Sequence, residues 1–283
     1  IWVCEKQIWS SLLGGVLPKL RNILVSFADR KFALSQRRLS ASALTYGFDE
    51  VRSFNPKHLT AEFKKENAAI LKNRRGYGYG IWKPHIIRRV LDTVGENDVV
   101  YYSDAGCEFI DDFSPILNVF SDDERGVVAF DLPGGHLEKH WTKRDLFLAM
   151  QLDEPRFTDK FQIQSGFIGW RNTDFARELL YEWEAWCCAA LDQEKSSPVL
   201  WLVSDCPSIL VNYEGFREHR HNQSVWSLLC EKHSVTVLND QTQYGLKYYR
   251  SHPDEYRIHL HRRNRSLKMV QRSLDGKKCS VLS

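Results

Sequence analysis

Short apolar runs that each lead to an acidic residue alternate along this chain with stretches of helical character. The two clearest runs are Ile23-Leu-Val-Ser-Phe27, which leads to Asp29, and Val99-Val-Tyr-Tyr102, which leads to Asp104. Uninterrupted apolar runs of this kind are typical of strands that are buried on both faces. Because such strands alternate with helices, the sequence predicts an α/β fold with a mainly parallel central sheet flanked by helices.

The other elements follow from the same patterns of periodicity and turn residues. Helices are expected over residues 32–46, 60–73, 85–94, 143–151, 174–191 and 222–232. Further strands are expected over residues 51–54, 126–131, 161–170 (with a glycine break), 234–238 and 257–263.

The two acidic residues that follow strands are the first candidates for a site. In open α/β sheets, ligands bind beyond the carboxyl ends of the strands, so Asp29 and Asp104 belong to the ligand-facing edge. The small residues after Asp104 would let a bulky anionic ligand approach, and its carboxylate could hold Mg²⁺ or Mn²⁺ against a diphosphate. A loop aspartate that caps the next turn is the alternative interpretation of Asp104.

Two charged segments offer further candidates. In the segment 257–263, His259 and His261 would lie on one face of a strand, where they could ligate a metal ion; a solvated basic tail is the alternative. The segment 138–145 combines an aromatic residue, cations and an acid, as expected of a cluster that shields an anionic donor. It is also typical of a helix N-terminus capped by Thr142.

Several classes of protein are excluded or disfavoured. The turn Gly76–Gly80 lacks the Lys-Ser/Thr ending of a P-loop, so it does not favour ATP hydrolysis. The seven cysteines are scattered, which predicts free thiols, a reducing compartment and a cytoplasmic location. No apolar run reaches the roughly 18–20 residues that span a bilayer.

The charge is unevenly distributed. Residues 257–283 contain eight Lys or Arg and one Asp, about +7, so the net charge of +3 leaves about −4 for the rest. We therefore expect no nucleic-acid partner for the body. The predicted organisation is an amphipathic segment over 1–20, one catalytic domain over 21–265 and a basic tail over 266–283. Peripheral contact with an anionic membrane is a further role for the two end segments.

Taken in order, several segments resemble those of small GT-A fold glycosyltransferases of polysaccharide biosynthesis and of large algal DNA viruses. They span residues 23–263 and read ILVSFAD, GYGYGIWKPHIIRRVL, VVYYSDAGCEF, HWTKRDLF, QSGFIGWRNT, HRHNQSVWSLL and IHLHRR. The resemblance implies a metal-dependent transferase that moves a sugar from a UDP- or GDP-linked donor to a hydroxyl of a glycan acceptor.

The resemblance also assigns donor and metal residues. The donor would contact the first strand end and the later cations, namely Ser26, Phe27, Asp29, Arg30, Lys83, Lys143 and Arg144. Asp104 would stand in the D-x-D motif as a catalytic and metal-binding residue, although Gly106 or Tyr102 replaces the second acid. His259 or His261 would complete the Mn²⁺ or Mg²⁺ site.

The acceptor side is assigned to Trp141, Trp170, His221 and Gln223. Tryptophan rings would stack on acceptor sugars, and Trp226 is a further candidate. Asn222 stands where the family commonly has Asp, and an amide cannot take up a proton. An inverting enzyme would need another carboxylate as its base, with Asp145 first and Glu138 and Asp205 behind it; a retaining enzyme would not.

Two rival functions stay open at this point. The degenerate D-x-D motif is compatible with an inactive GT-A-like module that binds glycans or nucleotide sugars. The basic tail is compatible with nucleic-acid binding, which would then be strongly dependent on salt.

Overall fold

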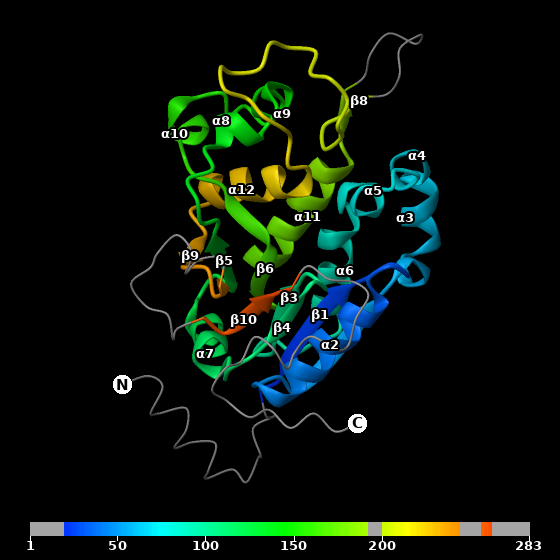
Figure 1. Cartoon of the computed structure of the whole chain (residues 1–283), viewed down its shortest axis with the longest axis vertical. Coiled ribbons are helices and arrows are strands. Elements are labelled where there is room, and N and C mark those ends of the chain that lie inside the picture. The colour runs from blue at the N-terminus through cyan, green and yellow to red at the C-terminus, as the bar shows by residue number, and fades with distance from the viewer. Residues whose placement is uncertain (1–19, 192–199, 244–255, 262–283) are drawn as a thin grey trace.

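The computed structural model describes residues 20–191, 200–243 and 256–261. Its centre is a six-stranded sheet with the strand order β2-β1-β3-β6-β5-β9 (Figure 1). The strands are β1 (Asn22–Phe27), β2 (Glu50–Phe54), β3 (Val99–Ser103), β5 (Val127–Asp131), β6 (Ile163–Arg171) and β9 (Thr236–Leu238). Every neighbouring pair is parallel except those of β6, which runs antiparallel to β3 and to β5. The predicted α/β fold with a mainly parallel sheet is therefore confirmed.

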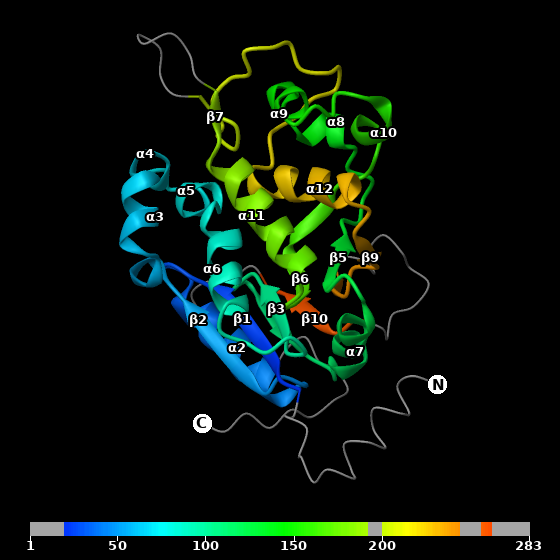
Figure 2. The same ribbon diagram turned by 180° about the vertical axis from the view of Figure 1, so that it is seen from behind.

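Helices and a small ribbon cover the two faces of this sheet (Figures 1 and 2). Ile23, Val25 and Phe27 of β1 pack on one face, while Leu24 packs on the other, as alternation along a strand requires. The first face carries α6 (Trp82–Leu91), α11 (Asp174–Cys188) and α12 (Asn222–Lys232). The second carries α2 (Ala33–Thr45), α7 (Ser114–Asp122) and the antiparallel ribbon of β4 (Cys107–Phe109) and β10 (Ile258–Leu260).

The glycine break that we expected in β6 corresponds to an irregularity in its pairing: the register with β5 shifts between the pairs Val128–Gly169 and Phe130–Gln164, a stretch that contains Gly166. The strand is continuous, and a Cβ atom on Gly169 would lie 2.5 Å from the ring of Phe120 on α7. Gly169 therefore lets an aromatic side chain pack against the backbone of the strand instead of interrupting it.

Other predicted elements differ in their bounds. The expected helix 60–73 is two helices, α3 (Ala61–Glu66) and α4 (Ala68–Leu71), separated at Asn67, whose side chain donates to the carbonyl of Phe63. Helix α6 begins before Pro84, because Ile81 already has right-handed helical backbone angles. The remaining short elements are η1 (Pro56–His58), α5 (Gly76–Tyr79), α8 (Glu138–Trp141), α9 (Arg144–Ala149), α10 (Pro155–Thr158), β7 (Ala190–Leu191) and β8 (Leu200–Trp201).

The predicted segments 1–20 and 266–283 lie outside the described residues, apart from Leu20. Within the described ranges, no helix combines the length and the apolar character that crossing a membrane requires. The five cysteines in these ranges are free thiols.

Candidate active site

A cavity of about 940 Å³ opens where β1 and β3 end. Because these two strands are adjacent and parallel, their carboxyl ends lie at the same edge of the sheet. Phe27 and Asp29 from the first strand end and Asp104 from the second all line the cavity, as predicted. Its other polar and charged lining residues are Lys31, Arg74, Arg75, Lys83, His136, Gln164, Ser165, Glu218, Arg220, His221, Asn222, Gln223, Asp240 and Thr242.

A buried lysine lies beneath Asp104. Lys83 is only 4% exposed, and its Nζ donates to Asp104 Oδ1 at 3.1 Å and to the carbonyl of Ser165 at 2.7 Å. The hydroxyl of Tyr102 donates to the same Asp104 oxygen at 2.7 Å. Burial, with the neighbouring carboxylate, raises the pKa of Tyr102 well above its usual value, so the phenol stays a donor. Asp104 is thus fixed by two donors, and a cation lies at the cavity wall.

The glycine-rich turn that precedes Lys83 has an unusual backbone. All residues from Gly76 to Gly80 have positive φ angles, including Tyr77 at 50° and Tyr79 at 60°. This region is unfavourable for residues with a Cβ atom, so three glycines among five positions reduce the cost. Trp82 closes the turn by donating to the carbonyl of Gly76 at 2.9 Å and by stacking on Phe27 at 3.8 Å. The turn thereby delivers its own side chains and Lys83 to the cavity.

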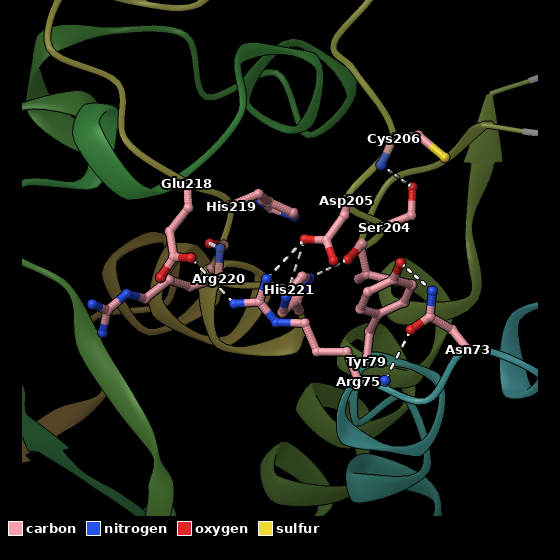
Figure 3. Close-up of polar contacts among 12 residues, drawn as sticks. Asn73, Arg75, Tyr79, Ser204, Asp205, Cys206, Glu218, His219, Arg220 and His221 are labelled. Carbon is pink, nitrogen blue, oxygen red and sulfur yellow. Dashed lines mark hydrogen bonds and ion pairs between the residues drawn. The ribbon is translucent and has the colours of Figure 1, made fainter.

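Ion pairs join this turn to the loop before α12 (Figure 3). Arg75 contacts Asp205 and Glu218, each at 3.2 Å, and His221 Nε2 lies 3.5 Å from Asp205. Burial lowers the pKa of His221, whose ring packs 4.6 Å from that of Tyr79. Because Arg75 and both carboxylates are more than 40% exposed, these pairs contribute little to stability and can rearrange when a ligand enters.

Trp141 does not line the cavity, contrary to its predicted role in stacking on a sugar. Its indole is covered by the guanidinium of Arg220 at 4.0 Å and that of Arg217 at 5.4 Å. His136 packs 5.1 Å from the same ring, and burial together with the two arginines lowers its pKa. Trp141 therefore holds Arg220 and His136, which do line the cavity, in place.

Trp170 is a second correction on the acceptor side. It is fully buried in the core between Trp183 and Trp226, with ring centroids 6.4 and 5.4 Å away. Neither Trp170 nor Trp226 can reach an acceptor sugar. The other two predicted acceptor residues, His221 and Gln223, do line the cavity.

Lys143 and Arg144 do not reach the predicted donor site either. Lys143 is buried, and its ammonium donates to the carbonyls of Trp201 and Ser204 at 3.0 and 3.4 Å. Arg144 is paired with Asp153 at 3.1 Å. Both cations are therefore used in holding the chain around α9, away from the cavity.

Asp145, the first candidate for a catalytic base, is also structural. Its buried carboxylate accepts the backbone N–H groups of Ile209 and Leu210, both at 3.1 Å. Neither Asp145 nor the alternatives Glu138 and Asp205 line the cavity. The carboxylates that do are Asp29, Asp104, Glu218 and Asp240.

The first strand end is only partly as predicted. Phe27 and Asp29 reach the cavity, whereas Ser26 is buried and accepts a hydrogen bond from Gln36 at 3.1 Å. Arg30 is exposed and does not line the cavity. Alternation along the strand explains why Ser26 and Phe27 point to opposite faces.

The predicted metal ligands are not brought together. His259 lies on β10, whereas His261 lies just beyond the end of that strand. Of these residues only Leu260, between the two histidines, lines the cavity. Among the described residues, no group of three or more His, Cys, Asp or Glu side chains is placed to hold a metal ion.

Several lining residues escaped the sequence interpretation, above all Arg74, Arg75, Gln164, Glu218 and Asp240. Four of them had a signal nearby. The two arginines precede the glycine-rich turn, Gln164 begins the QSGF segment, and Glu218 precedes the HRHNQS segment. Asp240 follows β9, a weak strand that gave no indication of a site.

Comparison with known proteins identifies the fold. No family model and no curated protein matches the chain. The apo structure of the WbbM bifunctional glycosyltransferase is similar over 87% of this chain, with a TM-score of 0.50 and 11% identity. The match covers 46% of WbbM, so this chain spans about half of that protein. Apo mouse xyloside xylosyltransferase 1 is similar over 84% of this chain and 97% of its own, with a TM-score of 0.45 and 10% identity. The likeness to WbbM shows that this chain shares the fold of part of that glycosyltransferase.

Proposed function

We propose that this chain transfers a sugar from a nucleotide diphosphate sugar to a hydroxyl of a glycan acceptor. The observation that carries the proposal is the ion pair of Asp104 with the buried Lys83 at the carboxyl edge of the parallel strands, in a cavity of about 940 Å³. A cavity of this size accommodates a nucleotide sugar. The resemblance to enzymes of polysaccharide biosynthesis and of large algal viruses supports a polysaccharide as the acceptor.

In this proposal, Phe27 and Asp29 lie beside the nucleoside, and Lys83 and Arg75 face the diphosphate. The bond between the anomeric carbon and the diphosphate oxygen breaks, and the electron pair leaves with the nucleoside diphosphate. The acceptor oxygen bonds to the anomeric carbon and loses its proton. Fixed cations beside the departing diphosphate stabilise the charge that develops there.

A divalent cation fits this site only with fewer protein ligands than we predicted. Asp104 offers one carboxylate, whose side chain is 53% exposed, and neither His259 nor His261 lines the cavity. Mg²⁺ is commonly held by one or two carboxylates and the phosphates of a substrate, so Asp104 and the diphosphate would hold it here. When bound, it would neutralise charge on the diphosphate.

The general base of an inverting transfer would come from the carboxylates that line the cavity. Glu218 and Asp240 are the candidates, because in this proposal Asp104 would hold the divalent cation and Asp29 lies at the nucleoside end. A cytoplasmic location is part of the proposal, supported by the free thiols of the described residues.

Calorimetry and transfer assays with UDP- and GDP-sugars, each with Mn²⁺ and with EDTA, test the proposal. The variant Asp104→Asn should lose donor binding and transfer. The matched control Asp111→Asn, at an exposed acid in the same stretch of chain, should retain both. Glycan binding without any effect of nucleotide sugars would instead identify an inactive binding module, and full activity of Asp104→Asn would refute the site.

A further inference from the structure

A buried acid is connected through one side chain to Gln223, a predicted acceptor residue that lines the cavity. Glu138 on α8 is fully buried, and its Oε2 accepts the hydroxyl of Thr142 at 2.8 Å and the side-chain amide of Gln162 at 3.1 Å. An ionised carboxylate only accepts hydrogen bonds, so it requires the NH₂ group of Gln162 to face it. The hydroxyl oxygens of Thr142 and Ser224 receive the same NH₂ group at 3.2 and 3.4 Å.

The orientation of Gln162 determines that of Gln223 on α12. With its NH₂ group facing Glu138, Gln162 presents its carbonyl oxygen to Gln223, whose Nε2 donates to it at 3.1 Å. Gln223 also lines the cavity. Since its NH₂ group is turned inward, the carbonyl oxygen is the part that is left for a ligand.

We propose that Glu138 is a positioning residue: through Gln162 it fixes the amide of Gln223 so that the Gln223 carbonyl accepts a hydrogen bond from an acceptor hydroxyl. The inference rests on the proposed transferase function for the identity of the ligand, and on the hydrogen-bond chain alone for the orientation. The proposed acceptor subsite therefore recognises a hydroxyl group that donates a hydrogen bond to the Gln223 carbonyl.

The same hydrogen-bond chain should respond to the protonation of Glu138. Burial raises the pKa of Glu138 to about 7, although hydrogen bonds from Ser227, Gln162 and Thr142 oppose the shift. Other titratable groups facing it are Glu231, whose charge raises that pKa further, and the Cys230 thiol, itself held protonated by burial.

A protonated Glu138 can donate to Gln162, which removes the constraint on both amides. Gln162 can then turn its NH₂ group to Gln223, and Gln223 must turn its own NH₂ group to the cavity. The acceptor subsite would thereby change from a hydrogen-bond acceptor to a donor as the pH falls through about 7.

The orientation is tested by NMR of the full chain labelled with ¹⁵N in its glutamine side chains, from pH 5.5 to 8.5. The amide signals are assigned with the variants Gln162→Leu and Gln223→Leu. In the wild type, the Gln223 amide should titrate with a midpoint near 7, and this titration should vanish in Glu138→Gln. The control variant is Glu184→Gln, which changes a partly buried acid on α11 that takes no part in the hydrogen-bond chain. In this variant, the Gln223 amide should titrate as in the wild type.

Gln162→Leu provides a second test should Glu138→Gln fail to fold. This variant interrupts the hydrogen-bond chain between Glu138 and Gln223 and leaves Glu138 ionisable. The titration of the Gln223 amide should therefore disappear there as well. A Gln223 amide that does not titrate near pH 7, or that still titrates in either variant, would overturn the proposed chain.

Kinetics separate this inference from the proposed function. With methyl glycosides of glucose, galactose, mannose and xylose as acceptors, the acceptor KM of the wild type should rise about tenfold from pH 8 to pH 6, while the donor KM stays within twofold. The change should be absent in Glu138→Gln. Equal changes in both KM values would assign Glu138 a purely structural role. Absence of transfer to any acceptor would refute the proposed function and the acceptor contact, whereas the NMR result would still decide the orientation of the amides.

Discussion

Replacing Glu138 by Gln should change how stability depends on pH. The acid is fully buried, and its pKa is raised from 4.5 to about 7. Between these values the folded protein binds more protons than the unfolded chain, so the free energy of unfolding of the wild type falls as the pH rises. Gln cannot ionise and has no such loss.

The magnitude follows from the size of the shift. A displacement of about 2.5 pKa units corresponds to about 3 kcal/mol, at about 1.36 kcal/mol per unit. Some of this is already lost at pH 5, because the unfolded chain is then largely ionised. We therefore expect the stability of Glu138→Gln relative to the wild type to be about 2.5 kcal/mol higher at pH 8 than at pH 5.

Urea unfolding of both proteins at pH 5, 6, 7 and 8 measures this difference. Glu184→Gln is the control with the opposite sign. Although burial opposes its ionisation, hydrogen bonds from His85 and Arg88 lower the pKa of Glu184. Its stabilising effect is therefore present above the unfolded pKa, so the loss in Glu184→Gln should be nearly constant from pH 6 to 8. A relative stability of Glu138→Gln that changes by less than about 1 kcal/mol between pH 5 and 8 would refute the reasoning.

Three further predictions concern the site and the core. Lys83→Met should weaken the binding of nucleotide sugars at least tenfold in calorimetry, because Asp104 and the diphosphate both lose a cation; unchanged binding would exclude Lys83 from the donor site. Asp145→Asn should lower stability by about 1–3 kcal/mol in thermal unfolding, since one of two backbone N–H groups loses its acceptor. Its kcat should stay within a fewfold of the wild type, and a hundredfold loss would restore Asp145 as the base. Gly169→Ala should cost about 1–3 kcal/mol in urea unfolding through its contact with Phe120, and a neutral effect would contradict the close packing of α7 on β6.

The parts of the site that could be predicted depend on strand direction. Phe27, Asp29 and Asp104 follow buried apolar runs, and parallel strands bring their ends to one edge whatever the rest of the chain does. The same apolar runs also predicted where these two strands begin and end. In contrast, the role of Gly169 could not be predicted, because the sequence shows a missing side chain but not the ring of Phe120 that fills the space.

The parts that could not be predicted depend on which way a side chain points. Alternation predicted that His259 and His261 share one face of a strand, but β10 ends at Leu260, and it is Leu260 that lines the cavity. The prediction that neighbouring charged residues act together was wrong for the same reason. Lys143, Arg144 and Asp145 are consecutive, yet each binds a different structural partner.

Buried carboxylates differ in how many of their oxygens accept hydrogen bonds. This difference distinguishes structural from functional carboxylates better than their positions in the sequence do. Both oxygens of Asp145 accept backbone N–H groups. Glu138 accepts hydrogen bonds from Thr142 and Gln162 on Oε2, and Ser227 also favours its ionised form, but within the described residues no donor meets hydrogen-bond geometry at its buried Oε1. A fully satisfied carboxylate is stable in one charge state, whereas a partly satisfied one is close in energy to its protonated form. Since Glu138 also connects through Gln162 to Gln223, which lines the cavity, we expect the protonation of Glu138 to change the hydrogen bonding that the cavity offers to a ligand.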